Sequence, residues 1–120
     1  MKYTGLLLKE GLQDETVLQR LVVTNTEIWD AENAEGDQPK QWTAIYFEVD
    51  EEKVDEIAKL LSKTLKPKGW YLNILGKDIV FVVLPNKVFK YKKGDTAKRI
   101  EAVEYGRMVG IPESQLDWQE

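Results

Sequence analysis

Residues 42–65 read WTAIYFEVDEEKVDEIAKLLSKTL, a strand pattern followed directly by a helix pattern. In the first part Ile45, Phe47 and Val49 alternate with other residues, as in a half-buried strand. In the second part, apolar residues recur at intervals of three and four and form one helical stripe. They are Val54, Ile57, Ala58, Leu61 and Leu65. We expect Asp50 to cap this helix, and Pro67 with Gly69 to end it.

The segment before this stretch predicts two further strands and a short helix. Tyr3 to Lys9 reads as a strand in which Gly5 is a weak point or a close-packing site. Asp14 can cap a helix with four apolar positions, and residues 23–29 form a β-branched strand whose buried face is ambiguous. The four positions are Val17, Leu18, Leu21 and Val22. The polar stretch 30–41 fits a solvated loop, and whether it has a function stays open.

The segment after it predicts three more strands and a final helix. A strand at 70–75 is followed by Ile79–Leu84, whose six consecutive apolar residues predict a central strand covered on both faces. A helix would cover one face, and a partner subunit or the C-terminal helix the other. Residues 88–91 alternate and end in lysines, as in a guarded edge strand. Asp95 or Thr96 then caps a helix over 97–109.

This order of elements predicts the fold class. The succession β-α-β-β-α-β, then a hairpin strand and a helix, is typical of an α+β fold. We therefore expect a two-layer, ferredoxin-like split βαβ sheet with an added C-terminal hairpin strand and helix. A chain of 120 residues fits a single α+β domain, residues 1–120.

Three stretches carry a resemblance to a known family. They are Trp42-Thr43-Ala44-Ile45, the run from Val88 to Asp95, and the segment from Gly110 to Trp118. On these stretches the chain resembles a family of small uncharacterised prokaryotic proteins, over nearly its whole length. The resemblance implies one ordered domain and brings no activity or cofactor with it.

Composition excludes many familiar enzyme sites. The chain has no histidine and no cysteine, the residues that most readily supply a neutral-pH base, a thiolate or a zinc ligand. It has no glycine-rich phosphate loop, and its two serines, Ser62 and Ser114, lie outside any nucleophile turn. We expect no metal and no cofactor. Without cysteine or a long apolar run, we also expect a cytoplasmic protein without a membrane partner.

A basic, aromatic run is the first candidate binding site. Lys90 and Lys92 alternate with Phe89 and Tyr91, and Arg99 follows, a pattern that can stack bases and hold phosphates. The simpler interpretation is that the aromatic residues pack inward while the lysines protect a sheet edge. We favour it, because the chain carries a net charge of −4 and nucleic-acid binders are usually basic.

Tryptophans are the second candidate, because aromatic residues are enriched at interface cores. The chain has four, and Trp118, Trp70 and Trp42 are our candidates for contact with a second subunit. For Trp118 the simplest alternative is docking on its own sheet, and a disordered tail is another.

Three functions follow from these candidates. The first is a binding or interaction module that acts as a homodimer. The second is a small-ligand-binding protein or enzyme with a cleft between the sheet and the 30–41 loop, using a buried glutamate such as Glu27 or Glu48 and a tyrosine such as Tyr46. The third is a weak binder of anionic ligands or RNA through strand 88–93, although we do not expect nucleic acid as the partner.

Overall fold

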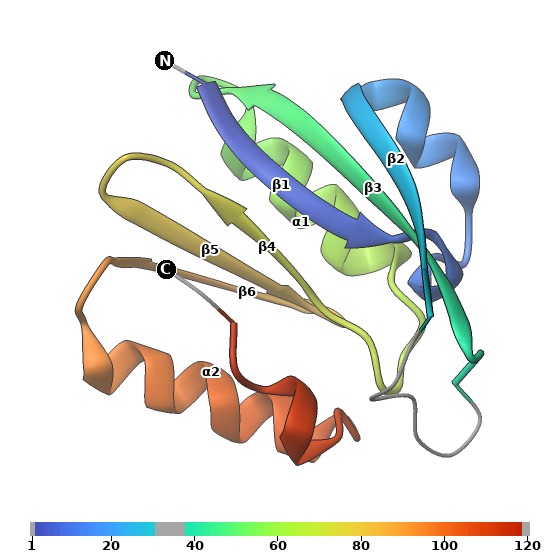
Figure 1. Cartoon of the computed structure of the whole chain (residues 1–120). Coiled ribbons are helices and arrows are strands. Elements are labelled where there is room, and N and C mark those ends of the chain that lie inside the picture. The colour runs from blue at the N-terminus through green and yellow to red at the C-terminus, as the bar shows by residue number, and fades with distance from the viewer. Residues whose placement is uncertain (1, 31–37, 119–120) are drawn as a thin grey trace.

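The computed structural model describes residues 2–30 and 38–118, which form one antiparallel sheet with helices on both faces (Figure 1). The sheet has six strands in the order β2-β3-β1-β4-β5-β6. The strands are β1 (Lys2–Leu8), β2 (Val22–Asp30), β3 (Gln41–Asp50), β4 (Leu72–Leu75), β5 (Ile79–Leu84) and β6 (Lys87–Lys92). The helices are α1 (Val54–Thr64) and α2 (Thr96–Met108), with short 3₁₀ helices η1 (Lys9–Gly11), η2 (Glu15–Arg20) and η3 (Glu113–Gln115). The α+β class is confirmed.

Strand β5 lies between two hydrophobic cores. Phe81 and Val83 belong to the core under α1, whereas Val80, Val82 and Leu84 belong to the core under α2. Since successive strand residues point to opposite faces, the two helices lie on opposite sides of the sheet. The predicted double coverage is therefore confirmed, and the chain's own C-terminal helix supplies it. A two-layer description is wrong for this half, which has three layers.

In the other half of the sheet, β1 and β3 are covered on one face only, and β2 is exposed on both. The core under α2 includes no residue of β1, β2 or β3, and Figure 1 shows α2 running below β4, β5 and β6. On the α2 side of β1–β3, Leu6, Trp29 and Tyr46 are only half-buried. We call this surface, the α2 side of β1, β2 and β3, the open face.

Two of the predicted helices differ from expectation, the first in its type and the second in its first residue. Asp14 caps as predicted, accepting from the Thr16 amide at 2.9 Å, but the element is a six-residue 3₁₀ helix. A segment this short favours tight i→i+3 bonds over an α-helix, and Val22 joins β2 instead. The Asp50 prediction is wrong: α1 starts after Lys53, and the Asp50 carboxylate pairs with Lys2 at 3.5 Å.

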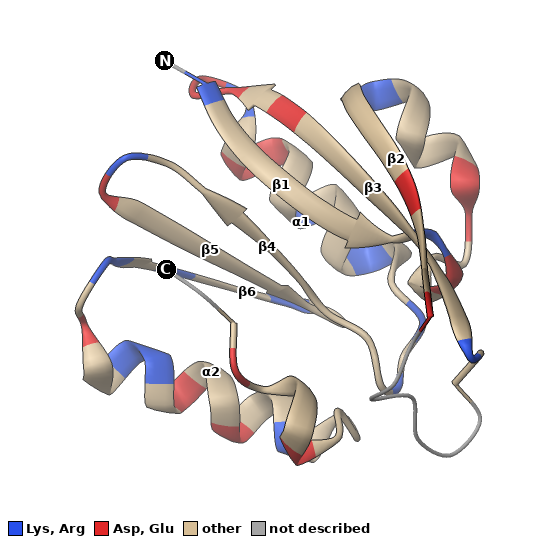
Figure 2. Cartoon of the chain, in the orientation of Figure 1, with Lys and Arg blue, Asp and Glu red and all other residues tan. Residues whose placement is uncertain are grey.

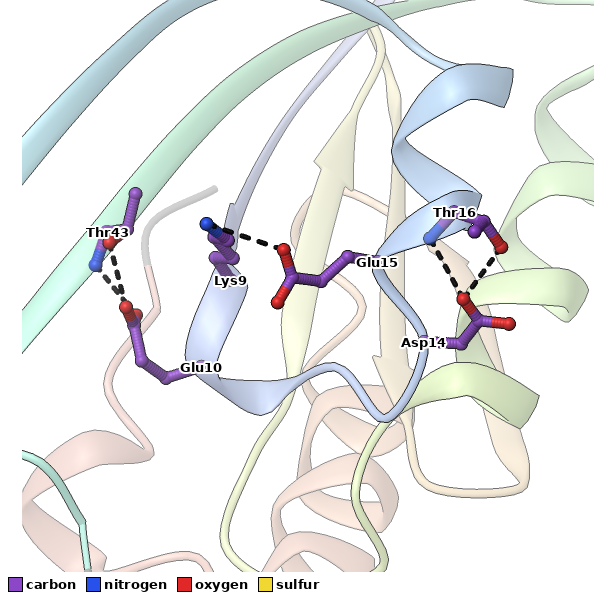
Figure 3. Close-up of polar contacts among 6 residues, drawn as sticks. All are labelled: Lys9, Glu10, Asp14, Glu15, Thr16 and Thr43. Atoms are coloured by element: carbon purple, nitrogen blue, oxygen red, sulfur yellow. Dashed lines mark hydrogen bonds and ion pairs between the residues drawn. The ribbon is translucent and has the colours of Figure 1, made fainter.

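A half-buried contact joins η1 to β3. The Glu10 carboxylate accepts from the Thr43 amide at 2.7 Å and from the Thr43 hydroxyl at 2.8 Å (Figure 3). Burial opposes ionisation of Glu10, but the bonds from Thr43 outweigh it and the pKa is lowered from its ordinary value. Nearby, Glu15 makes only a surface pair with Lys9, at 3.4 Å.

Acidic and basic parts of the sequence meet in the fold. Residues 14–56 hold thirteen acidic and three basic residues, and the remainder is basic. Asp50 pairs with Lys2, and Asp55 pairs with Lys90 at 3.3 Å, so the two blocks partly neutralise each other. Figure 2 shows where the charged residues lie along the strands and helices.

Part of the predicted 30–41 loop lies outside the described residues, including Glu32, Glu35 and Asp37. In the ranges 2–30 and 38–118, no helix has the length and apolarity needed to cross a bilayer.

Candidate ligand-binding groove

A concave site lies between the open face and the C-terminal segment. It has a volume of about 240 Å³. Leu6 and Leu8 of β1, Trp29 of β2 and Trp42 of β3 contribute to its lining. The remaining lining residues come from 69–73 and from the segment after α2. They are Gly69, Trp70, Tyr71, Leu72, Asn73, Gln115 and Asp117. We call this site the aromatic groove.

Aromatic side chains at the groove pack edge to face. Trp29 contacts Tyr46 with ring centroids 6.5 Å apart, and Trp42 contacts Trp70 at 6.0 Å. Trp29 and Trp42 lie directly opposite each other on β2 and β3, so their side chains leave the same face of the sheet. The strand register thus gathers large, rigid rings where no helix covers the sheet.

A carboxylate holds two of these rings in place. Glu27 accepts from Trp29 Nε1 and from the Tyr46 hydroxyl, both at 3.0 Å, and from Asn25 at 3.4 Å. The bond from Trp29, then that from Tyr46, lowers the pKa of Glu27. Glutamate and Tyr46 do come together, but Glu27 is exposed and stays ionised, which is the reverse of a buried base.

Glu48 does not join this arrangement. It lies on β3 opposite Val22 of β2 and Thr4 of β1, whereas Glu27 lies opposite Ala44. The two predicted glutamates are therefore on neighbouring strands but do not form a pair.

The far wall of the groove is held by hydrogen bonds to the C-terminal segment. The Tyr71 hydroxyl donates to the Gln115 carbonyl. Burial, then the negative charge of Asp117, raises the pKa of Tyr71. Gln38 and Gln115 exchange side-chain amide bonds of 3.2 and 2.8 Å, and Gln38 also donates to the Gly69 carbonyl at 3.0 Å. These bonds hold Gln38, which precedes β3, against Gly69 and against Gln115 in the segment after α2.

Two buried donors of groove-lining residues lack a partner within the described parts of the chain. They are the indole nitrogen Nε1 of Trp42 and the side-chain amide nitrogen Nδ2 of Asn73. Buried polar groups are nearly always hydrogen-bonded, because leaving one unpaired costs about 1–3 kcal/mol. Both belong to residues lining the same groove, which marks it as a place suited to a hydrogen-bond acceptor. Asn73 was not anticipated, although a polar residue inside an apolar strand was a signal.

The predicted basic site is divided by the sheet. Lys90 and Lys92 lie opposite Phe81 and Ile79 of β5, on the α1 side, and Lys90 pairs with Asp55 of α1. Arg99 is on α2, on the opposite side. The sheet therefore keeps Arg99 apart from the two lysines. β6 is an edge strand whose Phe89 and Tyr91 pack towards α2, as the simpler interpretation predicted.

Arg99 instead holds the chain's own C-terminal segment. Its guanidinium lies 4.8 Å from the centroid of the Trp118 ring and donates to the Trp118 carbonyl at 2.7 Å. Trp118 is only 6% exposed, contacts Tyr71 edge to face, and donates to the Tyr91 hydroxyl at 3.1 Å. Docking of Trp118 on its own sheet, the simplest alternative, is what the structure shows.

The other two predicted interface tryptophans also pack within the chain. Trp70 is 8% exposed and belongs to the core under α1. Trp42 is half-buried and lines the aromatic groove. Burial of Trp70 and Trp118 leaves little of either ring for a second subunit.

A second cavity lies between α1 and β6. Its volume is about 420 Å³, and it is lined by Lys59 and Lys63 of α1 and by Lys87 and Lys90 around β6. Asp55 offsets the charge of Lys90, and the lysines of α1 lie towards its C-terminal half, where the helix dipole already attracts cations. In residues 2–30 and 38–118, no three acidic side chains cluster as a metal site requires.

Comparison with known proteins adds no relative: no family model, no curated protein and no solved structure matches the chain.

Proposed function

We propose that the chain is a binding module whose aromatic groove takes a small ligand. The observation that carries the proposal is the pair of unpartnered buried donors, Trp42 Nε1 and Asn73 Nδ2, in the wall of an aromatic cavity. Ligand sites are typically apolar concavities with a few polar groups that fix orientation, and this groove has that composition.

The lining indicates the chemistry of the ligand. Trp29 and Trp42 offer flat apolar surface, so the ligand should be planar and largely apolar. The free donors call for a carbonyl-type acceptor. Both nitrogens are covered by their surroundings, so neighbouring side chains must shift for the acceptor to reach them. Asp117 on the wall and Glu27 beside Trp29 disfavour an anion, which leaves a neutral or cationic molecule. A volume of about 240 Å³ suits a small molecule.

We propose binding without catalysis. Acid–base catalysis by a carboxylate needs a pKa raised towards neutrality. The bonds from Trp29 and Tyr46 act in the opposite direction on Glu27. Its role in this proposal is to hold the two rings that border the groove.

The first four strands support a more specific description of the fold. Counted from β4, they lie in the order β4-β1-β3-β2 and are all antiparallel. We propose that this half is a ferredoxin-like split βαβ unit in which η2 replaces the first helix, with β5, β6 and α2 as additions. A cytoplasmic homodimer remains part of the proposal, although the buried tryptophans no longer argue for the dimer.

Titration with coumarin tests the groove, since coumarin is flat, neutral and carries a carbonyl. We expect ¹H–¹⁵N NMR to show shifts of the Trp42 indole and Asn73 amide signals. Trp42→Phe should weaken coumarin binding about tenfold, because it removes a hydrogen bond of about 1–1.5 kcal/mol. Trp29→Phe is the matched control: it removes an indole that also lines the groove, but one already bonded to Glu27.

Two results would count against the proposal. One is the absence of any coumarin-dependent shift at Trp42 and Asn73 at millimolar concentration. The other is equal weakening by Trp42→Phe and Trp29→Phe, which would mean that the free donor has no part in binding.

A further inference from the structure

We propose that the outer edge of β2 pairs antiparallel with β2 of a second copy, so that two sheets join into one across a two-fold axis. The inference goes beyond ligand binding and does not rest on the groove. Its starting point is the position of β2 at the end of the strand order.

The outer edge of β2 is long and unpaired among the described residues. The strand has nine residues, so it extends roughly 30 Å, and its one strand partner is β3. Eight of its residues are exposed and Trp29 is half-buried. A long edge of this kind presents main-chain donors and acceptors that can pair with another strand.

Apolar side chains are concentrated on this strand. Val22 is 57% exposed, Val23 44% and Ile28 65%. They are three of the five large apolar side chains exposed in the described ranges, and the other two, Ile100 and Met108, lie on α2. Single exposed apolar residues are ordinary, whereas a group along one unpaired edge indicates association.

The opposite edge of the sheet is protected by lysines, whereas this edge has only two carboxylates, Glu27 and Asp30, and one bulge. β6 carries Lys87, Lys90 and Lys92, and like charges disfavour edge pairing. β2 has no lysine. Its one irregularity is a bulge between Val23 and Asn25, close to its start, after which Asn25–Asp30 pair residue by residue with β3.

A second copy fits this edge better than an unrelated strand. Antiparallel pairing brings the start of one β2, beside Arg20, next to the end of the other, at Asp30, so opposite charges approach each other twice, with Arg20 also in an exposed pair with Glu56 of its own chain at 3.7 Å. The dimer then ends on both sides in the lysine-rich β6, which stops further growth and gives a closed assembly. A biological interface should bury at least about 1,000 Å² in total. Shared among the nine β2 residues of each copy, this minimum amounts to about 55 Å² per residue.

Sedimentation velocity on the whole chain tests the inference, with Ile28→Lys as the disruptive variant and Ile100→Lys as its matched control. Both changes put a lysine at an exposed isoleucine, but only the first lies on β2. We expect the wild type and Ile100→Lys to sediment as a dimer of the 13.9 kDa chain at about 100 µM. Ile28→Lys should raise the dimer dissociation constant at least about tenfold.

Hydrogen exchange gives an independent readout. Amide protection in β2 should rise with protein concentration in the wild type and not in Ile28→Lys. A wild type that is monomeric at 1 mM would overturn the inference, as would a dimer that Ile28→Lys and Ile100→Lys leave equally tight. Either result leaves coumarin binding in the groove untouched, so the two proposals fail separately.

Discussion

The two halves of the sheet differ in how many of their faces are covered by helices. Strands β4, β5 and β6 lie between α1 and α2, and their side chains fill two cores. Strands β1 and β3 have one covered face, whereas β2 is exposed on both, and the α2 side of these three strands carries half-buried rings, an exposed carboxylate and a cavity. The core under α1 is shared by both halves, the core under α2 belongs to the covered half alone, and the open half offers the surfaces that a ligand or a second copy can use in our proposals. Replacing matched residues in the two halves tests this division.

The largest difference should appear between two tryptophans. Trp118→Ala removes a 6% exposed ring from the core under α2 and should lower the free energy of unfolding by about 3–5 kcal/mol. Trp29→Ala, on the open face, should lower it by about 1 kcal/mol or less. Urea unfolding followed by circular dichroism measures both. Equal losses would show that the open half contributes as much stability as the covered half.

Aliphatic residues should repeat this difference on a smaller scale. Leu84 is fully buried in β5, and Leu84→Ala should cost about 2–4 kcal/mol through lost burial and a cavity. Ile28→Ala, at a 65% exposed position of β2, should change the unfolding free energy by less than about 0.5 kcal/mol at a concentration where the chain is monomeric. A large cost for Ile28→Ala under those conditions would contradict the description of β2 as an exposed edge.

Glu10 ties the open half to η1, and its removal should have a moderate, pH-dependent effect. Glu10→Gln weakens two charge-assisted bonds to Thr43 and, given partial exposure, should cost about 1 kcal/mol at pH 7. The folded pKa lies below the ordinary value of 4.5, so this stability is present above that value and is lost as the pH falls through the folded pKa.

The control for this prediction is Glu15→Gln, which breaks only the surface pair with Lys9. We expect Glu15→Gln to be nearly neutral and to keep the acid sensitivity of the wild type, whereas Glu10→Gln should show less of it. Denaturant unfolding between pH 7 and pH 3 checks both. Identical pH profiles for Glu10→Gln and the wild type would refute the role given to the Thr43 contact.

A small, pH-dependent loss should come from removing the hydroxyl of Tyr71, which lies at the boundary between the halves. Tyr71→Phe removes the bond to the Gln115 carbonyl and should cost about 0.5–1 kcal/mol at neutral pH. The folded pKa of Tyr71 is raised above the ordinary 10.0, so its contribution is complete below pH 10 and is lost as the pH rises further. Thermal unfolding from pH 8 to pH 11 should therefore decline less steeply in Tyr71→Phe than in the wild type; equal slopes would argue against a buried, neutral Tyr71.

Strong periodic patterns predicted most of the fold. Ile79–Leu84 matches β5, and the stripe from Val54 gives α1, because burial on both faces or along one stripe leaves a local signature. No comparable pattern in the sequence predicts which side of the sheet α2 covers. α2 meets the sheet through the small residues Ala102 and Gly106, so its apolar pattern does not show which face it packs on.

The candidate site was harder to predict for the same reason. Glu27 and Tyr46 were named, but strand register decides that they meet, and hydrogen bonds decide that Glu27 stays ionised. Lys90, Lys92 and Arg99 are close in sequence yet lie on opposite sides of the sheet. Tyr71, Asn73 and Gln115 join the groove through contacts between distant segments, which no local pattern encodes.

The Gln38–Gln115 pair connects positions that are 77 residues apart. Closing so long a loop costs the chain entropy that the contact must offset. The wall of the aromatic groove is therefore complete only when the segment after α2 has docked beside residues 69–73. Under the proposed function, a ligand bound in the groove would stabilise the folded molecule by mass action.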